Sequence, residues 1–358
     1  MARISTVLIK GGRVFDGEKF FTSDILTEGK KILKIEPNLN DAADFIYDAR
    51  GKTVCAGLVD AHVHMKNISS EVFGINAEMS SIPFGVTSAA DASGRFGDKA
   101  LLESFLVKGV VFSAVEIKDN HACFEETEKS LERFGNLAVG VKVYFDSSNP
   151  ELVDTTPLRE SCDFAHARGL SVMVHASGSP SPMREVINTL GAGDILTHAF
   201  HGGKNTAAED GFESIALAKE RGVIIDAGLA GHIHTDFAVY KEAISRGAIP
   251  DIISTDITRL SAYTRGGRYG LTTCMSISRH LGMREEDIFR CVTENPARAL
   301  RKEDEWGLLA VGRCADIAVL EYTDEGFDLT DRAGNHIKSD TGYRCVLTVA
   351  DGDVVYRY

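Results

Sequence analysis

The stretch Val54-Cys55-Ala56-Gly57-Leu58-Val59-Asp60-Ala61-His62-Val63-His64 decides the fold of this chain. An apolar run that ends in alternating polar residues predicts a buried β-strand. Because alternate side chains of a strand point to the same face, His62 and His64 project together from one edge of a sheet. Two neutral imidazoles placed in this way can hold a transition metal once other segments supply further ligands.

Seven further apolar runs follow, roughly 23 to 32 residues apart, with helical patterns between most of them. The runs centre near Ser88, Phe112, Lys142, Val174, Thr197, Ile225 and Ser254. Three of the helical patterns span 156–168, 209–221 and 237–246, and a glycine follows each. Eight strand–helix units over about 250 residues predict an α/β fold built on a (β/α)8 TIM barrel. A doubly wound sheet is the alternative, but the chain has no glycine-rich phosphate loop.

Both ends of the chain show a different pattern, in which short strands are joined by turns. Turn signals stand at Gly11-Gly12, Asp16-Gly17 and Glu28-Gly29, and again at Asp351-Gly352. Because β-rich termini have edges to satisfy, the two ends are expected to pair into one small β-sandwich. The expected domains are this composite sandwich, residues 1–56 plus 309–358, and the barrel, residues 57–308.

The composition disfavours several classes of partner. With 39 Lys and Arg against 52 Asp and Glu, the net charge is −13, which disfavours nucleic acid and anionic membrane surfaces. The N-terminus is too short and polar for a signal peptide, and no run of about 18 apolar residues predicts a membrane span. The 7 cysteines are scattered without a CxxC pair, as expected of reduced thiols in a cytoplasmic protein. We expect a small-molecule substrate, no nucleic-acid or membrane partner, and a homo-oligomer.

In a barrel of this kind the active site lies at the C-terminal ends of the strands. Those ends carry four histidines, a lysine and an aspartate: His62, His64, Lys142, His175, His198 and Asp256. Imidazole and carboxylate groups are common ligands of transition metals. The six side chains are therefore expected to meet around metal ions.

Lys142 is unusual in this set because a cationic side chain does not bind a metal. Burial lowers the pKa of a lysine and favours the neutral amine. A neutral amine beside two divalent cations can react with carbon dioxide to give a carbamate, an anionic group whose two oxygens can bridge both metals. A buried structural lysine paired with an acid is the alternative, but the five other strand-end ligands favour carboxylated Lys142.

These residues resemble the metal site of the amidohydrolase superfamily. The resemblance rests on residues 57–64, on Lys142, His175 and His198, and on Ser254-Thr255-Asp256. Two segments near the end of the chain, 292–299 and 311–316, are also typical of that superfamily. The pattern is most similar to the binuclear branch that contains dihydroorotases, dihydropyrimidinases and amino-acid deacylases. Within it, segments 196–202 and 250–256 are similar to an amidohydrolase/deacetylase metallohydrolase group, whereas residues 226–234 depart from that group's glycine-rich pattern.

The resemblance implies a binuclear mechanism. His62, His64 and Asp256 would hold one metal, His175 and His198 would hold the other, and the carboxylated lysine would bridge them. The two ions would share a hydroxide and polarise the substrate carbonyl, while Asp256 would act as general base and then as general acid. Imidazole-rich sites favour two zinc ions, with manganese, iron or cobalt as alternatives.

Four arginines are candidates for substrate binding. A guanidinium fork at the mouth of the barrel can clamp a substrate carboxylate. One candidate follows the second strand and three follow the eighth: Arg95, Arg259, Arg265 and Arg268. A solvated loop charge is the alternative for each.

Other polar residues near the strand ends have narrower roles. His201, three residues beyond the histidine of strand six, is a candidate for a hydrogen bond to substrate or to a metal ligand. His232 and His234 form a second HxH pattern, but they lie in a glycine-rich loop. A metal role is not expected for them, and substrate contact is the alternative. Asp60 shares a strand face with His62 and is expected to orient its imidazole.

The function that fits these features best is a metal-dependent hydrolase of an amide or ester bond, which releases an acyl group from a small carboxylated molecule. A cyclic amide hydrolase of the dihydroorotase or hydantoinase type is the nearest alternative, because the binuclear site serves either. A nucleobase deaminase is less favoured, since single-metal deaminases lack the bridging lysine. A non-catalytic homologue is disfavoured because all six ligand positions are filled.

Overall fold

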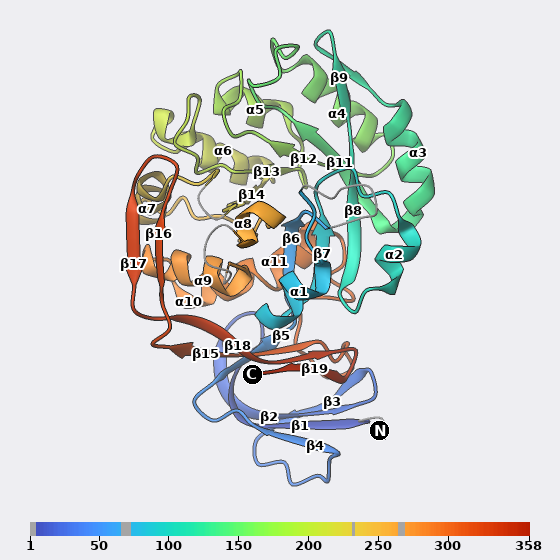
Figure 1. Ribbon diagram of the computed structural model, residues 1–358, viewed down its shortest axis with the longest axis vertical. Helices are drawn as coiled ribbons and strands as arrows, with labels where there is room; N and C mark the ends of the chain where they lie inside the picture. The colour runs from blue at the N-terminus through green and yellow to red at the C-terminus, as the bar shows by residue number, and fades with distance from the viewer. Residues whose placement is uncertain (1–4, 66–72, 231–232, 264–268) are drawn as a thin grey trace.

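The structure is a computed structural model that describes residues 5–65, 73–230, 233–263 and 269–358 (Figure 1). Seven parallel strands form the barrel sheet in the order β14-β13-β12-β11-β8-β7-β6. They are β6 (Leu58–Val63), β7 (Val86–Asp91), β8 (Lys108–Ala114), β11 (Ala138–Tyr144), β12 (Ser171–His175), β13 (Ile195–Thr197) and β14 (Ile224–Asp226). Nearly all of their residues are buried, as expected of parallel strands covered on both faces.

An eighth segment, residues 252–257, closes the barrel. Isolated parallel bridges join Ile252 to Asp226 of β14 and Ile257 to Val63 of β6. Within the segment Asp256 has φ 46° and leaves the extended conformation. The predicted (β/α)8 barrel is confirmed.

Eleven helices are found in the described part of the chain, and several cover the outside of the barrel (Figure 1). They are α1 (Ala77–Ser81), α2 (Lys99–Ser104), α3 (Glu125–Phe134), α4 (Thr156–His166), α5 (Met183–Thr189), α6 (Glu213–Arg221), α7 (Phe237–Ser245), α8 (Arg259–Tyr263), α9 (Leu271–His280), α10 (Glu285–Cys291) and α11 (Glu294–Ala299). Of the three helices expected from the sequence, α6 starts later than the expected residue 209. A 3₁₀ turn at Ala207–Asp210 precedes it, and the left-handed backbone of Gly211 and Phe212 separates the two.

The two chain ends pair with each other, as predicted for the small terminal β-sandwich, and their strands are joined in one continuous hydrogen-bonded sheet. Its order is β19-β18-β15-β5-β1-β2-β3, and β4 pairs with β1. The strands are β1 (Thr6–Phe15), β2 (Phe20–Glu28), β3 (Lys31–Glu36), β4 (Phe45–Asp48), β5 (Thr53–Ala56), β15 (Ile317–Thr323), β18 (Gly342–Ala350) and β19 (Asp353–Arg357). The turn expected at Gly11-Gly12 is instead a bulge within β1, where Gly11 has φ 68° and its N–H donates to Asp24.

Two short hairpins extend from these bodies. One pairs β9 (Glu116–Lys118) with β10 (His121–Cys123), and the other pairs β16 (Phe327–Thr330) with β17 (His336–Ser339). The second lies alongside α7 (Figure 1), where the carboxylate of Asp331 accepts a hydrogen bond from the Phe237 N–H at 2.7 Å. Within the described ranges, no helix is both long enough and apolar enough to cross a bilayer.

Aromatic packing joins the terminal sheet to the barrel. Phe289 of α10 is fully buried, and its ring centroid lies 5.5 Å from that of Phe15 and 5.3 Å from that of Phe20. Aromatic pairs at such separations add to the stabilisation that burial gives. The position of the terminal sheet therefore depends on a shared apolar cluster.

We predict that Phe289→Ala lowers the free energy of unfolding by about 3–5 kcal/mol, because a large buried ring is replaced by a cavity. Chemical denaturation of the variant and the parent protein measures this difference. Val311→Ala is the matched control: its side chain is exposed, and a change below about 0.5 kcal/mol is expected. Equal losses for the two variants would contradict the role given to Phe289.

Candidate metal centre

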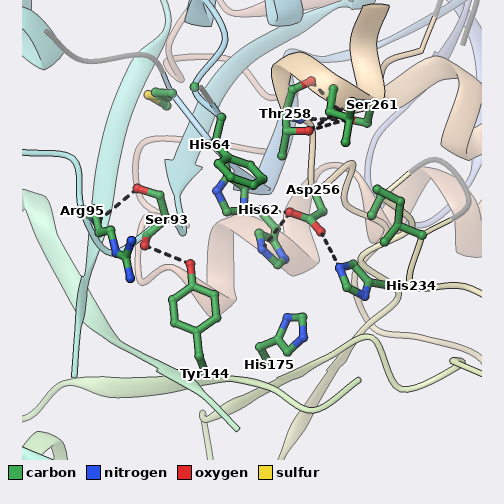
Figure 2. Close-up of a pocket in the computed structure, with 16 residues that line it drawn as sticks. His62, His64, Ser93, Arg95, Tyr144, His175, His234, Asp256, Thr258 and Ser261 are labelled. Atoms are coloured by element: carbon green, nitrogen blue, oxygen red, sulfur yellow. Dashed lines mark hydrogen bonds and ion pairs between the residues drawn. The ribbon is translucent and has the colours of Figure 1, made fainter. Parts of the chain in front are cut away.

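The six side chains predicted as metal ligands lie together at the C-terminal end of the barrel. Figure 2 shows four of them, His62, His64, His175 and Asp256. The six come from the ends of β6, β11, β12 and β13 and from segment 252–257. Four of them line a cavity of about 640 Å³: His62, His64, His175 and Asp256. Lys142 and His198 are fully buried beside them. The structure thus brings all six residues to one place, while their roles as ligands stay a prediction.

Asp256 is the centre of the first group. Its Oδ1 lies 2.8 Å from Nε2 of His64 and 3.3 Å from Nε2 of His62. The Asp256 N–H donates to the His62 carbonyl at 2.8 Å, so the backbone fixes this approach. Burial by itself raises the pKa of Asp256, but the facing imidazoles of His62 and His64 hold it well below its usual range.

The imidazole of His62 is oriented by Asp226 and Thr197. Its Nδ1 lies 3.1 Å from Thr197 Oγ1 and 3.4 Å from Asp226 Oδ2. Asp226 in turn accepts hydrogen bonds from the hydroxyls of Thr197 and Ser254, both at 2.7 Å. Because Nδ1 faces these oxygens, Nε2 of His62 is directed to the cluster.

Asp60 does not have the role expected from the sequence. Its carboxylate accepts hydrogen bonds from Thr255 Oγ1 at 2.6 Å and from the Thr255 N–H at 3.1 Å. It therefore joins β6 to the eighth segment, and Asp226 orients His62 instead. The sequence signal for Asp226 was available, since it ends the apolar run of strand seven just as the predicted ligands end theirs.

His198 and His175 form the second group. His198 has φ 66°, and its Nδ1 donates to the Gly228 carbonyl at 2.7 Å. Its Nε2 is buried and has no hydrogen-bond partner among the described residues. The ring of His175 lies 4.6 Å away, and its own Nε2 faces Asp146 Oδ2 at 3.5 Å. A buried ring nitrogen that carries a lone pair and has no partner is what a metal ligand requires.

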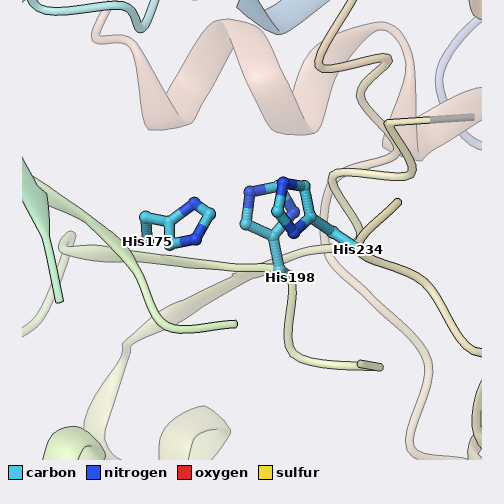
Figure 3. Close-up of side chains that lie close together, drawn as sticks. All are labelled: His175, His198 and His234. Carbon is cyan, nitrogen blue, oxygen red and sulfur yellow. The ribbon is translucent and has the colours of Figure 1, made fainter. Parts of the chain in front are cut away.

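His234 joins this second group, which the sequence did not predict. Its ring centroid lies 4.3 Å from that of His198 and 4.8 Å from that of His175 (Figure 3). The ligand atoms of these three histidines all lie within 4.8 Å of one another, and the same holds for His62, His198 and Asp256. The second HxH pattern of the sequence is a signal for His234, but a metal role is not expected from it because this histidine lies in a loop and not at the end of a strand.

The buried site favours uncharged nitrogen ligands. Burial lowers the pKa of His62 to about 4 and that of His234 to about 4, and it lowers the pKa of His198 well below the ordinary value. Burial also lowers the pKa of Lys142 to about 8, although Asp256 and other carboxylates oppose it. Neutral imidazoles and a neutral amine are the forms that can bind metals and react with carbon dioxide. The residues present therefore fit divalent cations.

Among the residues that the structure describes, Lys142 forms no ion pair of the kind that a structural lysine needs. Its Nζ lies 3.3 Å from Nε2 of His62, and none of the ion pairs among the described residues includes it. An unpaired ammonium at a fully buried position is strongly unfavourable. This arrangement supports the carboxylated lysine over the buried ion pair.

The predicted substrate contacts divide into separate places. Arg95 lines the 640 Å³ cavity beside Tyr144 (Figure 2). Arg259 is exposed on α8 and is not among the residues that line this cavity. Arg265 and Arg268 lie outside the described residues. His201 is buried in the wall of a neighbouring cavity of about 680 Å³, which also includes His234.

The loop that carries Arg95 is held by hydrogen bonds between polar groups, of which Asp91 is fully buried. Asp91 accepts a hydrogen bond from Ser93 Oγ at 2.5 Å, and Tyr144 Oη donates to the Ser93 carbonyl at 2.9 Å. Ser93 Oγ accepts the Arg95 N–H at 3.1 Å. The cavity wall is otherwise largely apolar, and its apolar side chains include Met65, Phe73, Ile233 and Leu260. Among the described residues, the lining of this cavity thus combines Arg95 with a broad apolar surface.

Comparisons with known proteins agree with this geometry. Residues 53–355 match the model of the amidohydrolase family. The chain is 28% identical to a deacetylase of Brucella anthropi over 88% of this chain and 83% of that protein, and 28% identical to a deacetylase of Agrobacterium fabrum over 88% and 82%. A solved structure described as a dihydroorotase superimposes with a TM-score of 0.86 at 24% identity, covering 99% of this chain and 100% of the other. The last likeness concerns the fold.

We predict that Asp226→Asn weakens metal binding roughly 10–100-fold, because it removes the carboxylate that orients His62. Competition of the metal-loaded protein with a chromophoric chelator measures the affinity. Asp328→Asn is the matched control, since Asp328 is an exposed acid on the β16–β17 hairpin that contacts only His336 among the described side chains. Unchanged affinity in Asp226→Asn would show that this carboxylate does not support the metal site.

Proposed function

The chain belongs to the amidohydrolase family, and from this premise we propose that it is a metal-dependent deacylase that cleaves an amide or ester bond of a small carboxylated substrate. As a member of this family it is a hydrolase that acts on carbon–nitrogen bonds. Relatives that cover most of its length are named deacetylases, which supports the acyl-releasing reaction. The dihydroorotase-like fold leaves the cyclic amide hydrolase as the second candidate to be tested.

The observation that carries the proposal is the buried Nε2 of His198, which lies in a cluster of imidazoles and has no hydrogen-bond partner in the part of the chain that the structure describes. Members of this family generally use divalent metals. We assign His62, His64 and Asp256 to one cation and His175 and His198 to the other, with carboxylated Lys142 between them and zinc as the metal. When bound, the two cations would supply Lewis acidity to the substrate carbonyl and lower the pKa of an attacking water.

The residues of the chain would divide the remaining work. Asp256 would accept the proton of the attacking water and return it to the leaving nitrogen or oxygen. Its Oδ2 lies 3.7 Å from Nε2 of His198 and 4.0 Å from Nε2 of His234, so it faces the centre of the cluster. The apolar wall would seat the substrate and exclude water, and Arg95 would pair with its carboxylate.

The partner and location predictions complete the proposal. The 640 Å³ cavity at the cluster supports a small-molecule substrate. A homo-oligomeric state, a cytoplasmic location and the absence of nucleic-acid and membrane partners stay predictions from the sequence.

A substrate screen tests the proposed reaction. Zinc-loaded protein is assayed with N-acyl amino acids, acyl hydroxy acids, dihydroorotate and hydantoins. We expect turnover of acyl compounds that carry a free carboxylate. Hydrolysis confined to the cyclic amides would replace the deacylase with the second candidate, and a single metal per chain together with deamination of nucleobases would overturn both.

We predict that Lys142→Ala lowers the metal content from two cations per chain to one or fewer and reduces turnover by roughly 10³-fold, because the bridging group and its charge are lost. Elemental analysis and steady-state kinetics measure the two effects. Lys241→Ala, which removes an exposed lysine of α7, is the matched control and should change neither. Two retained metals with full turnover in Lys142→Ala would exclude the bridge.

Arg95→Gln should raise KM for a carboxylated substrate roughly 10–100-fold, because a charged hydrogen bond contributes about 1.5–3 kcal/mol. The neutral methyl ester or amide of the same acyl compound should be affected little. Arg184→Gln, on the exposed face of α5 where it pairs with Glu213, serves as the control. An equal effect on charged and neutral substrates would remove Arg95 from carboxylate recognition.

A further inference from the structure

His234 lies in the loop between β14 and α7, and the metal assignment above gives it no role. The assignment of six ligands leaves one cation with two imidazoles and the other with two imidazoles and a carboxylate. We propose that His234 is a third imidazole ligand of the cation assigned to His175 and His198. This inference rests on the proposed metal-dependent function and adds a seventh protein ligand to it.

The geometry of the three rings supports the inference. Their centroids are separated by 4.6 Å for His175 and His198, 4.8 Å for His175 and His234, and 4.3 Å for His198 and His234. One ligand nitrogen from each lies within 4.8 Å of the others. Figure 3 shows the three imidazoles gathered around one point, although they come from three different segments of the barrel rim.

Hydrogen bonding leaves nitrogens of this group without partners. Nε2 of His198 and Nδ1 of His234 are both buried, and neither has a hydrogen-bond partner among the described residues. Buried polar atoms are normally paired, and leaving them unpaired is unfavourable. Since Nδ1 of His198 already donates to the Gly228 carbonyl, its Nε2 is an acceptor. Such an acceptor, close to two other imidazoles, suits a cation better than a further hydrogen bond.

The loop that carries His234 is fixed at both ends. Before it, the N–H groups of Leu229 and Ala230 donate to carbonyls of the eighth segment at 3.1 and 3.0 Å. After it, the Asp236 N–H donates to the Phe200 carbonyl at 3.0 Å, and the Asp236 side chain caps α7. The position of His234 over the cluster is therefore set by the barrel rim, as a metal ligand requires.

The charges around the three rings are compatible with a cation. Among the described residues, Oδ2 of Asp256 lies 4.0 Å from Nε2 of His234 and 3.7 Å from Nε2 of His198, and Oδ2 of Asp146 lies 3.5 Å from Nε2 of His175. Because imidazoles are neutral ligands, these carboxylates would supply negative charge that partly balances a divalent cation.

Zinc retention tests the inference. Zinc-loaded protein is equilibrated with increasing concentrations of a chromophoric chelator, and the zinc that remains is counted per chain. We expect His234→Gln to lose one cation at a chelator concentration at least tenfold lower than the parent protein does, with the other cation unaffected. His121→Gln is the control, since His121 is an exposed histidine of the β9–β10 hairpin far from the cluster in sequence and pairs with Glu160, and this variant should retain both cations like the parent.

The outcomes separate this inference from the proposed function. A parent protein that binds fewer than two zinc ions defeats the proposed function itself. A parent with two zinc ions and a His234→Gln variant that keeps both equally well overturns the inference. In that case a raised KM would assign His234 to substrate contact. His234→Ala repeats the measurement, and thermal melting of each variant verifies that the loop substitution leaves the fold intact.

Discussion

Closure of the barrel is the constraint on which the rest of the structure depends. The carboxylate of Asp60 holds both the N–H and the hydroxyl of Thr255, and the Asp256 N–H donates to the His62 carbonyl. These contacts bring the first and last strands of the barrel side by side, although a long stretch of chain separates them. Only in a closed barrel does Asp256 face His62 and His64. In a doubly wound sheet, which is open, the ligands of the first strand and those of the eighth segment would lie apart.

The site is held ready by groups that do not face the cavity. The carboxylate of Asp226 accepts hydrogen bonds from the hydroxyls of Thr197 and Ser254 and orients His62. The Gly228 carbonyl orients His198. Each imidazole has lost most of its contact with water, and Nε2 of His198 and Nδ1 of His234 gain no hydrogen-bond partner among the described residues in return. Removing these polar nitrogens from water is unfavourable, and bound cations would offset that free-energy cost. Preorganisation of this kind removes the need to reshape the site when metal binds.

Much of this could be predicted from the sequence, because strand-end ligands follow from two simple periodicities. Apolar runs locate the strands, and the last polar residue of each run lies at the rim, which is why His175 and His198 were found. The same rule applied to strand seven would have added Asp226. The second HxH pattern marks His234, but this residue follows no strand directly, so the strand periodicity does not place it beside the other imidazoles. The domain limits 1–56 plus 309–358 and 57–308, and the placement of Arg265 and Arg268, stay predictions.

Two of the assigned ligands occupy backbone conformations that side chains rarely adopt. His198 has φ 66° and Asp256 has φ 46°, both in the left-handed region where only glycine is free of steric cost. The fold therefore stores conformational strain at the residues that give it chemistry. Glycine at either position would relieve this strain and stabilise the fold, but it would also remove the side chain that is assigned as a metal ligand. Selection for activity and selection for robustness act in opposite directions at the same two backbone sites.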